Sequence, residues 1–305
     1  MFGSKELLHD RTKEAPGFRG NIENIITPPK SKTPSNSIMP TSSKLLFSDD
    51  GISVAQHVNQ VLVLTLDRGP NVVNPSLTKS LHQALDCIDQ EVAHPKALVI
   101  TAKGKFFSNG LDLEYMMQDS TASKSSSTTK DQMMDMLNRN GKMIESFWRL
   151  LARILVMDCR TVAAINGHAF GAGIFLALTC DFRIMRTNKG YLCWPEVNLG
   201  MRLSKGFAEL TKAKVTDPQV LREGVLTGKR YSSRDALNAK LIDQECEIDD
   251  LLQVAVELAR AGFPDQLRLQ NFNPENFKVM KMELYTDAYR ALAMGSFDAK
   301  PESRL

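Results

Sequence analysis

Two short stretches of the sequence set glycine and other small residues among apolar ones. Residues 104–113, GKFFSNGLDL, contain a Ser-Asn-Gly corner, and residues 166–181, NGHAFGAGIFLALTCD, pass through a Gly-Ala-Gly corner into an apolar helix. The first N–H groups of a helix have no internal acceptor and carry the positive end of its dipole. If the N–H groups of Leu111 and Ala172 converge, they form an oxyanion hole from which the apolar surroundings exclude water. Taken alone, both stretches also fit ordinary tight turns between a strand and a helix.

A glutamate in a third stretch is the candidate base. Glu196 follows Pro195 in YLCWPEVNLG, residues 191–200, where Trp194, Val197 and Leu199 are its apolar neighbours. Apolar surroundings disfavour a charged carboxylate and raise its pKa, as a general base near neutral pH requires. A carboxylate that caps a helix or forms an ion pair fits these residues equally well.

Strands and helices of an α/β layer structure must position these stretches. Continuous apolar runs predict strands buried on both faces at residues 61–66, 97–101 and 161–166. Asn74 and Pro75 predict the start of a helix. Apolar residues then recur at helical spacing, at Leu77, Leu81, Leu85, Ile88 and Val92.

The sequence as a whole predicts three segments. Residues 1–48 contain five prolines among Ser, Thr and Lys and predict a disordered extension. Residues 49–203 are the α/β core, in which residues 118–132 are predicted to be a mobile loop and 133–157 a helix. The buried face of that helix is expected to contain Met143, Phe147, Leu150, Leu151 and Ile154. Residues 204–305 read as successive helices without a strong strand, and one of these helices is predicted over residues 273–295.

Composition and charge argue against several classes of function. The net charge of +3 comes from basic residues spread among acidic ones, which argues against nucleic-acid binding. The five cysteines form no CxxC pair, so we expect neither a metal site nor a disulfide framework. No apolar run approaches the roughly 18 residues of a membrane span, and we expect none. Ser303-Arg304-Leu305 resembles the Ser-Lys-Leu peroxisomal address, which predicts peroxisomal localisation through an import receptor.

Together these motifs resemble the enoyl-CoA hydratase/isomerase (crotonase) superfamily. The resemblance covers roughly residues 54–260 and rests on four stretches in the family's order: LDRGPNVVNPSL, GKFFSNGLDL, INGHAFGAGIFLALTCDFRI and PEVNLG. It implies a crotonase-like spiral of ββα repeats with a helical C-terminal oligomerisation region, and homotrimers or hexamers. In detail the chain is most similar to the plant-type peroxisomal Δ3,Δ2-enoyl-CoA isomerases.

The resemblance also implies site residues. The N–H groups of Leu111 and Ala172 would bind the thioester oxygen of an acyl-CoA substrate, and Glu196 would be the catalytic base. No cofactor is implied, because coenzyme A is part of the substrate. The residues expected to contact substrate or coenzyme A are Arg68, Ser108, Asn109, Gly110, Asp112, Gly171 and Phe175.

Two departures from the family's hydratases refine this expectation. Hydratases carry a second glutamate at the position of Phe175, so a single carboxyl indicates isomerisation of a 3-enoyl-CoA in fatty-acid β-oxidation. Glu114 stands where many hydratases have a lysine for the coenzyme A phosphates, which leaves Arg68 and Lys105 as candidates for that contact. Glu114 is the reserve acid or base, with a solvated position at the loop edge as the alternative. Asp112 is expected to hold its loop, and His168 to pack or cap. Hydration, another crotonase reaction and a non-catalytic acyl-CoA-binding module are the alternatives.

Overall fold

The computed structural model describes residues 43–57, 60–91, 96–118, 129–261 and 273–297 of the 305-residue chain. Its strands are β1 (Lys44–Asp49), β2 (Ile52–Gln56), β3 (Val61–Leu66), β4 (Ala97–Ala102), β5 (Phe106–Ser108), β6 (Arg160–Ile165), β7 (His168–Phe170), β8 (Phe182–Arg186), β9 (Leu192–Cys193) and β10 (Gln244–Cys246). Its α-helices are α1 (Pro75–Gln90), α2 (Leu113–Met117), α3 (Thr129–Leu155), α4 (Ala172–Thr179), α5 (Lys205–Lys214), α6 (Pro218–Thr227), α7 (Ser233–Asn238), α8 (Ile248–Ala261), α9 (Pro274–Leu284) and α10 (Thr286–Met294). A 3₁₀ helix, η2, spans Glu196–Leu199.

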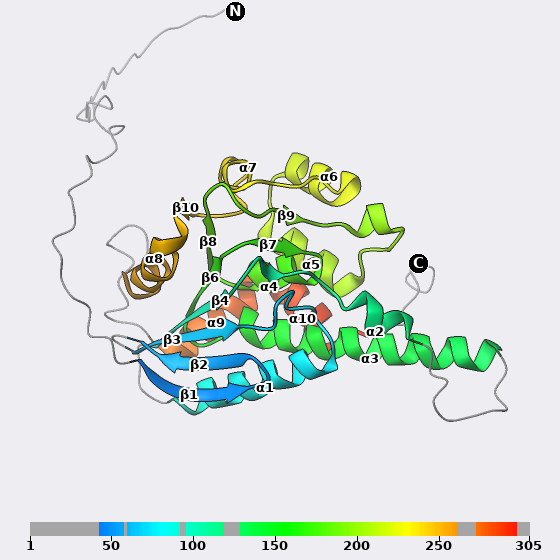
Figure 1. The fold of residues 1–305 in the computed structure, drawn as a ribbon, viewed down its shortest axis with the longest axis horizontal. Helices are drawn as coiled ribbons and strands as arrows, with labels where there is room; N and C mark the ends of the chain where they lie inside the picture. Colours follow the sequence, from blue (N-terminus) through cyan, green and yellow to red (C-terminus); the bar gives the residue numbers. More distant parts are fainter. Residues whose placement is uncertain (1–42, 58–59, 92–95, 119–128, 262–272, 298–305) are drawn as a thin grey trace, which may run out of the picture. The chain divides into compact units, whose positions relative to one another are not determined.

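The strands form two sheets. The larger has the order β1-β2-β3-β4-β6-β8-β10 (Figure 1), and it is antiparallel from β1 to β3 and parallel from there on. The smaller has the order β5-β7-β9 and is parallel throughout. Each of its strands has only two or three residues.

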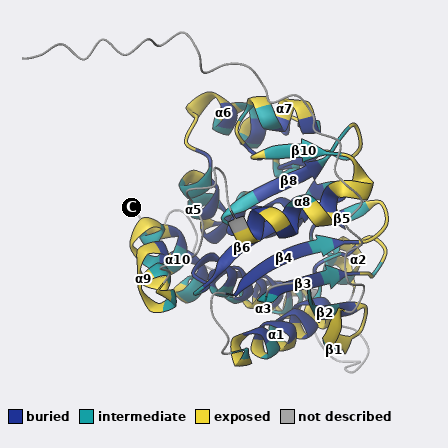
Figure 2. Cartoon of the chain, turned by 90° about the vertical axis from the view of Figure 1, so that its left-hand side faces the viewer, coloured by how far each residue is buried: buried dark blue, intermediate teal, exposed yellow. Residues whose placement is uncertain are grey.

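Helices cover both faces of the larger sheet, which explains its continuous apolar strands. Val61 and Val63 of β3 belong to a core cluster with residues of α8, and Figure 2 shows α8 lying across the sheet. Leu62, Leu64 and Leu66 belong to the larger cluster, which also contains residues of α1 and α3. The predicted strands at residues 61–66, 97–101 and 161–166 are therefore confirmed as β3, β4 and β6.

The two long helices of the core also follow their sequence signals. Asn74 caps α1, since its side chain accepts a hydrogen bond from the Leu77 N–H at 2.9 Å, and Pro75 occupies the first turn. The apolar face of α1 is buried as predicted, except that Val92 lies outside the described residues. The predicted buried face of α3 is buried at every position: Met143, Phe147, Leu150, Leu151 and Ile154.

The structure corrects four expectations. The extension predicted over residues 1–48 is wrong for residues 44–48, which form β1 and pair with β2 across a turn at Asp50 and Gly51; residues 1–42 lie outside the described ranges. The C-terminal region, predicted without a strong strand, contains the three-residue strand β10, which pairs with β8. The loop predicted over residues 118–132 is already helical from Thr129, and residues 119–128 are not described. The helical run predicted from residue 273 to 295 is two helices, broken at Tyr285.

The two strands that were not predicted share a physical cause. Six residues of β1 and three of β10 are too few for a period to be visible, and their hydrogen bonds come from partners elsewhere in the chain. Within the described ranges, no helix combines the length and the apolar character needed to cross a membrane.

Candidate active site

The small sheet brings the three stretches together. The strands β5, β7 and β9 are parallel, so their carboxyl ends lie at one edge. Gly110 and Leu111 follow β5, Gly171 and Ala172 follow β7, and Glu196 follows β9. Segments separated by more than eighty residues therefore end at a common place.

The backbone at the two glycines confirms how closely the stretches approach. Gly110 has φ +92°, and a Cβ at this position would lie 2.9 Å from the carbonyl oxygen of Phe170 and 3.6 Å from the nitrogen of Ala172. Gly171 has φ +48°, and a Cβ there would lie 3.7 Å from Oε1 of Glu196. Both glycines are thus required by conformation, and Gly110 also by the close approach of another chain segment.

Two backbone N–H groups at this place are available. The Val73 N–H donates to the Gly110 carbonyl at 2.8 Å and the Asp112 N–H donates to the Val73 carbonyl at 3.0 Å, so the Leu111 N–H faces away from Val73. Ala172 is the first residue of α4, where an N–H has no partner inside the helix. Within the described part of the chain, neither N–H donates a hydrogen bond. The pair can stabilise negative charge on an oxygen placed between them.

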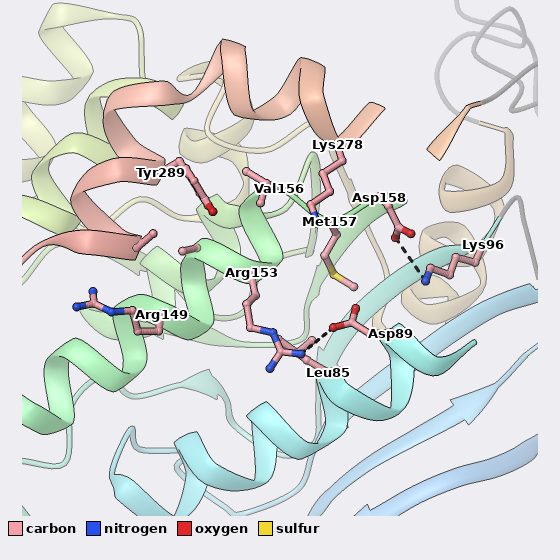
Figure 3. A pocket seen from close by; sticks show the side chains of 12 residues that line it. Leu85, Asp89, Lys96, Arg149, Arg153, Val156, Met157, Asp158, Lys278 and Tyr289 are labelled. Carbon is pink, nitrogen blue, oxygen red and sulfur yellow. Dashed lines mark hydrogen bonds and ion pairs between the residues drawn. The ribbon is translucent and has the colours of Figure 1, made fainter. Parts of the chain in front are cut away.

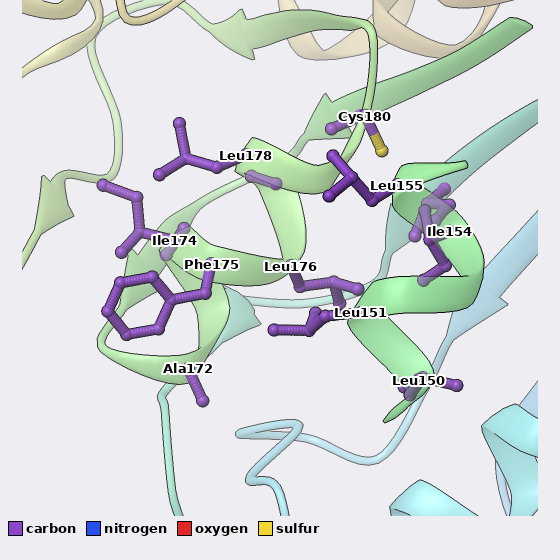
Figure 4. Packing of buried hydrophobic residues seen from close by; sticks show 14 of the residues in the cluster. Leu150, Leu151, Ile154, Leu155, Ala172, Ile174, Phe175, Leu176, Leu178 and Cys180 are labelled. Carbon is purple, nitrogen blue, oxygen red and sulfur yellow. The ribbon is translucent and has the colours of Figure 1, made fainter. Parts of the chain in front are cut away.

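Helix α4 is anchored in the core behind these donors. All eight of its residues are buried, and Figure 4 shows Ala172 at its start, with Leu176 and Leu178 among the core side chains. The Phe175 ring is fully buried and stacks on Phe207 of α5, with ring centroids 4.1 Å apart and planes 8° apart. The position therefore offers no group that could hold water, and its contact with substrate stays a prediction.

Glu196 is the first residue of η2, and its carboxyl is largely removed from solvent. Its Oε2 is buried without a hydrogen-bond partner in the described chain. Burial raises the pKa of Glu196 above its ordinary value, and the hydrogen bond from its own backbone opposes this only in part. Trp194 is buried as expected, but Val197 and Leu199 are 46% and 51% exposed, so these two do not shield the carboxyl in the single chain.

The loop before α2 is held by side chains that need not touch substrate. Asp112 caps α2 by accepting from the Tyr115 N–H at 2.9 Å and also accepts from Nδ2 of Asn74 at 3.0 Å. These bonds agree with the loop-holding role predicted for Asp112. Ser108 is buried and donates to the Asn71 carbonyl at 2.7 Å, whereas Asn109 is exposed.

The charged candidates differ in their positions. Arg68 forms an ion pair with Asp50 in the β1–β2 turn, with a distance of 3.1 Å. Glu114 is exposed on α2, as the solvated alternative predicted. Lys105 precedes β5 and therefore lies at the opposite end of the small sheet from Glu196.

Asn71 is a positioning residue that the sequence did not single out. It is fully buried with φ +48°, and its Nδ2 donates to the carbonyls of Phe106 and Phe107 at 3.1 and 3.3 Å. Its Oδ1 accepts from the Arg68 N–H at 2.8 Å. The Gly-Pro-Asn turn that contains it is the signal that could have identified it.

A cavity elsewhere is excluded as the site. It has a volume of about 530 Å³ and lies among residues of α1, α3, α9 and α10 (Figure 3). None of the predicted site residues lines it. Several of its charges are paired with one another or with neighbours, as in Arg153 with Asp89 and Lys96 with Asp158.

Comparisons with known proteins show the family of this chain. Residues 56–269 match the family model described as Enoyl-CoA hydratase/isomerase. The chain is 30% identical over 227 residues to enoyl-CoA delta isomerase 2, peroxisomal, of Arabidopsis thaliana, which covers 74% of this chain and 88% of that protein. It is 27% identical to an enoyl-CoA isomerase/hydratase of Mycosarcoma maydis, over 84% of this chain and 87% of the relative.

Solved structures show the fold. A Mycobacterium tuberculosis protein titled an enoyl-CoA isomerase superposes with a TM-score of 0.67 at 23% identity, over 81% of this chain and 96% of its own. The expected crotonase-like α/β architecture with C-terminal helices is therefore confirmed, while the oligomerisation role of those helices stays a prediction. On the family match and the extent of the similarity, the chain belongs to the enoyl-CoA hydratase/isomerase family.

Proposed function

We propose that this protein is a Δ3,Δ2-enoyl-CoA isomerase that moves the double bond of a 3-enoyl-CoA to the 2-trans position. The observation that carries the proposal is one carboxyl with a buried oxygen, that of Glu196, beside the two corners whose N–H groups have no acceptor in the described chain. The names of the Arabidopsis thaliana relatives support the same reaction type.

The reaction needs only these groups. The Glu196 carboxylate removes a proton from C2, and the electron pair of the C–H bond moves toward the thioester carbonyl to form a dienolate. The N–H groups of Leu111 and Ala172 stabilise the charge on the thioester oxygen. The carboxyl then returns the proton to C4, which leaves the double bond between C2 and C3.

The raised pKa of Glu196 suits both halves of this cycle. A carboxylate held in a desolvated place is a stronger base than a solvated one, and its protonated form persists long enough to donate at C4. Hydration would need a second group to hold and activate water. Phe175, stacked on Phe207 in the core, supplies none.

The proposal includes the compartment in which the protein acts, the peroxisome. The tail Ser303-Arg304-Leu305 lies outside the described residues, but its sequence suits a peroxisomal import receptor, and two of the Arabidopsis thaliana relatives are named peroxisomal. A conjugated 2-enoyl-CoA is a substrate for further β-oxidation. No metal or redox cofactor takes part in the proposed steps.

The proposal is tested by offering the purified protein trans-3-hexenoyl-CoA and, separately, trans-2-hexenoyl-CoA, and following the absorbance of the conjugated thioester. An increase with the first substrate and no decrease with the second supports the isomerase. A decrease with the second would make the protein a hydratase, and no change with either would favour an acyl-CoA-binding module.

A further inference from the structure

A second cavity lies at the end of the small sheet that is farther from Glu196. Its volume is about 660 Å³, within the range typical of small-molecule sites. Its walls include residues that precede or begin the three short strands or belong to the β8–β9 connection, among them Lys105, Asn166, His168, Arg186, Lys189 and Tyr191. Because the strands are parallel, these amino-terminal ends share one edge and the oxyanion corners the other.

The charge around this cavity is positive and not neutralised. Lys105, Arg186 and Lys189 line it, and no aspartate or glutamate does. Among the described residues, none of the three forms an ion pair with a carboxylate. The carboxylate of Asp235, near the rim, is engaged by the Ser232 N–H and hydroxyl in a capping box. Cations gathered around one concavity without a counter-ion favour an anionic ligand.

Two residues in the wall of this cavity have polar atoms without a hydrogen-bond partner in the described chain. Asn166 is 3% exposed, and its Nδ2 donates to the Gly104 carbonyl at 2.9 Å, which fixes Oδ1 as the free acceptor. Within the described chain, Oδ1 of Asn166 and Nδ1 of His168 are buried and have no hydrogen-bond partner. Buried polar atoms are nearly always paired, so a donor from a bound molecule would complete this wall. An inorganic anion such as pyrophosphate has no N–H to offer.

An aromatic surface adjoins this wall, and its ring planes are tilted by 33° to 46° from the plane of the His168 ring. The His168 ring lies 5.7 Å from Tyr191, 4.9 Å from Phe170 and 5.4 Å from Phe106, measured between ring centroids. Burial, together with the nearby charges of Lys105 and Arg230, lowers the pKa of His168, so the ring is neutral at neutral pH and stays able to accept. Tyr191 is 41% exposed and leaves part of this surface open.

We propose that this cavity binds a nucleotide. Its phosphates would meet Lys105, Arg186 and Lys189, its base would pack on the ring surface of His168 and Tyr191, and an amino group of the base would donate to Oδ1 of Asn166. The ligand that fits this chemistry is a free adenine nucleotide, bound at the end of the small sheet away from the acyl-CoA site. The proposal does not depend on the isomerase activity, because its readout is binding.

The test is calorimetric titration of the full-length protein with ADP, pyrophosphate and coenzyme A in turn. The double variant R186E/K189E is compared with K79E/R222E, which makes the same change of charge at exposed positions away from the cavity. We expect ADP to bind and the first double variant to weaken it by at least about tenfold, as loss of charge-assisted contacts to phosphate does. The control should change its affinity by less than about twofold.

Two further comparisons of binding affinity test which part of the ligand each residue contacts. Asn166→Ala should weaken ADP but not pyrophosphate, because only the base uses Oδ1, and the retained pyrophosphate affinity shows that the variant is folded. If R186E/K189E weakens ADP alone, the ligand is a free nucleotide; if it weakens ADP and coenzyme A equally, the cavity is part of the acyl-CoA site and the proposal is overturned. Absence of ADP binding at millimolar concentration, or equal ADP affinity in the wild type and R186E/K189E, would overturn the proposal.

Discussion

At the scale of single residues, the site depends on what surrounds one carboxyl and two glycines. Glu196 has an unpartnered buried oxygen and a raised pKa, which is a cost to the folded state that only a function requires. Gly110 and Gly171 have positive φ, and each lies beside atoms of another of the three stretches. These residues could be identified from the sequence because their types are unusual for their surroundings. The place where they meet could not be predicted from the sequence, because it depends on strands of two or three residues that carry no periodic signal.

Replacing Glu196 with glutamine should make the protein more stable at neutral pH. The pKa of Glu196 is raised in the folded state, so the folded chain binds this proton more tightly than the unfolded chain. The residue's contribution to stability therefore falls as pH rises from the ordinary pKa through the raised one. Thermal unfolding at pH 7 should give a higher Tm for E196Q, while Glu114→Gln, at an exposed position, should leave Tm unchanged. An unchanged or lower Tm for E196Q would contradict the desolvation of this carboxyl.

Replacing Gly110 with alanine should lower kcat by about 10²-fold, comparable to the loss of one oxyanion donor. The added Cβ would lie 2.9 Å from the Phe170 carbonyl, so the corner must shift and move the Leu111 N–H. Gly69→Ala is the matched control, because Gly69 also has positive φ, +66°, but a Cβ there meets nothing within 4 Å. The measurement is kcat of both variants by steady-state kinetics. An equal loss of kcat in the two variants would assign the effect to backbone strain alone.

At the scale of elements, the long and regular parts of the fold could be predicted and the short ones could not. The strands β3, β4 and β6 are recognisable in the sequence as continuous apolar runs, because helices cover both faces of their sheet. Asn74 and Pro75 predict where the helix α1 begins. In contrast, β1 and β10 exist because a neighbouring strand offers hydrogen bonds, which is information from distant sequence. The same holds for the bond between Asn74 and Asp112, which ties the start of α1 to the loop before α2.

A half-buried lysine makes the packing of α5 depend on pH. Burial lowers the pKa of Lys214 to about 7, and its Nζ donates to the Cys180 carbonyl at 3.3 Å. Between this value and the ordinary 10.5, the unfolded chain holds a proton that the folded chain has released, so the contribution of Lys214 to stability rises with pH. Denaturant unfolding at pH 7 and pH 9.5 should show this rise.

The rise should shrink when Lys214 is replaced by methionine. Lys212→Met, on the same helix with a side chain 59% exposed, should keep it. If Lys214→Met and the wild type gained the same free energy of unfolding between these pH values, another group would be responsible.

At the scale of the whole molecule, the family fold leaves apolar side chains uncovered on its C-terminal helices. Val279, Met280 and Leu284 of α9 are 53%, 66% and 71% exposed, and Met294 of α10 is 80% exposed. Such a group of side chains favours association with another copy of the chain, as the family resemblance predicts. The sequence shows these residues as part of an amphipathic pattern but does not show which of them the chain's own core leaves open.

Charge placed on α9 should therefore reduce the oligomer. The double variant M280E/L284E should shift the mass measured by light scattering toward that of one chain of 34.0 kDa. Glu275→Lys, at an exposed polar position of the same helix, should leave the mass unchanged. An unchanged mass for M280E/L284E would exclude this face of α9 from the assembly.

The central claim is that one carboxyl, Glu196, performs the proton transfer. The most direct test is to measure the turnover of trans-3-hexenoyl-CoA by the wild type, E196Q and E114Q under identical conditions. We expect E196Q to lose about 10²- to 10⁴-fold in kcat, as removal of a general acid–base group does, while E114Q keeps the wild-type rate. Retained activity in E196Q, or a comparable loss in E114Q, would contradict the account.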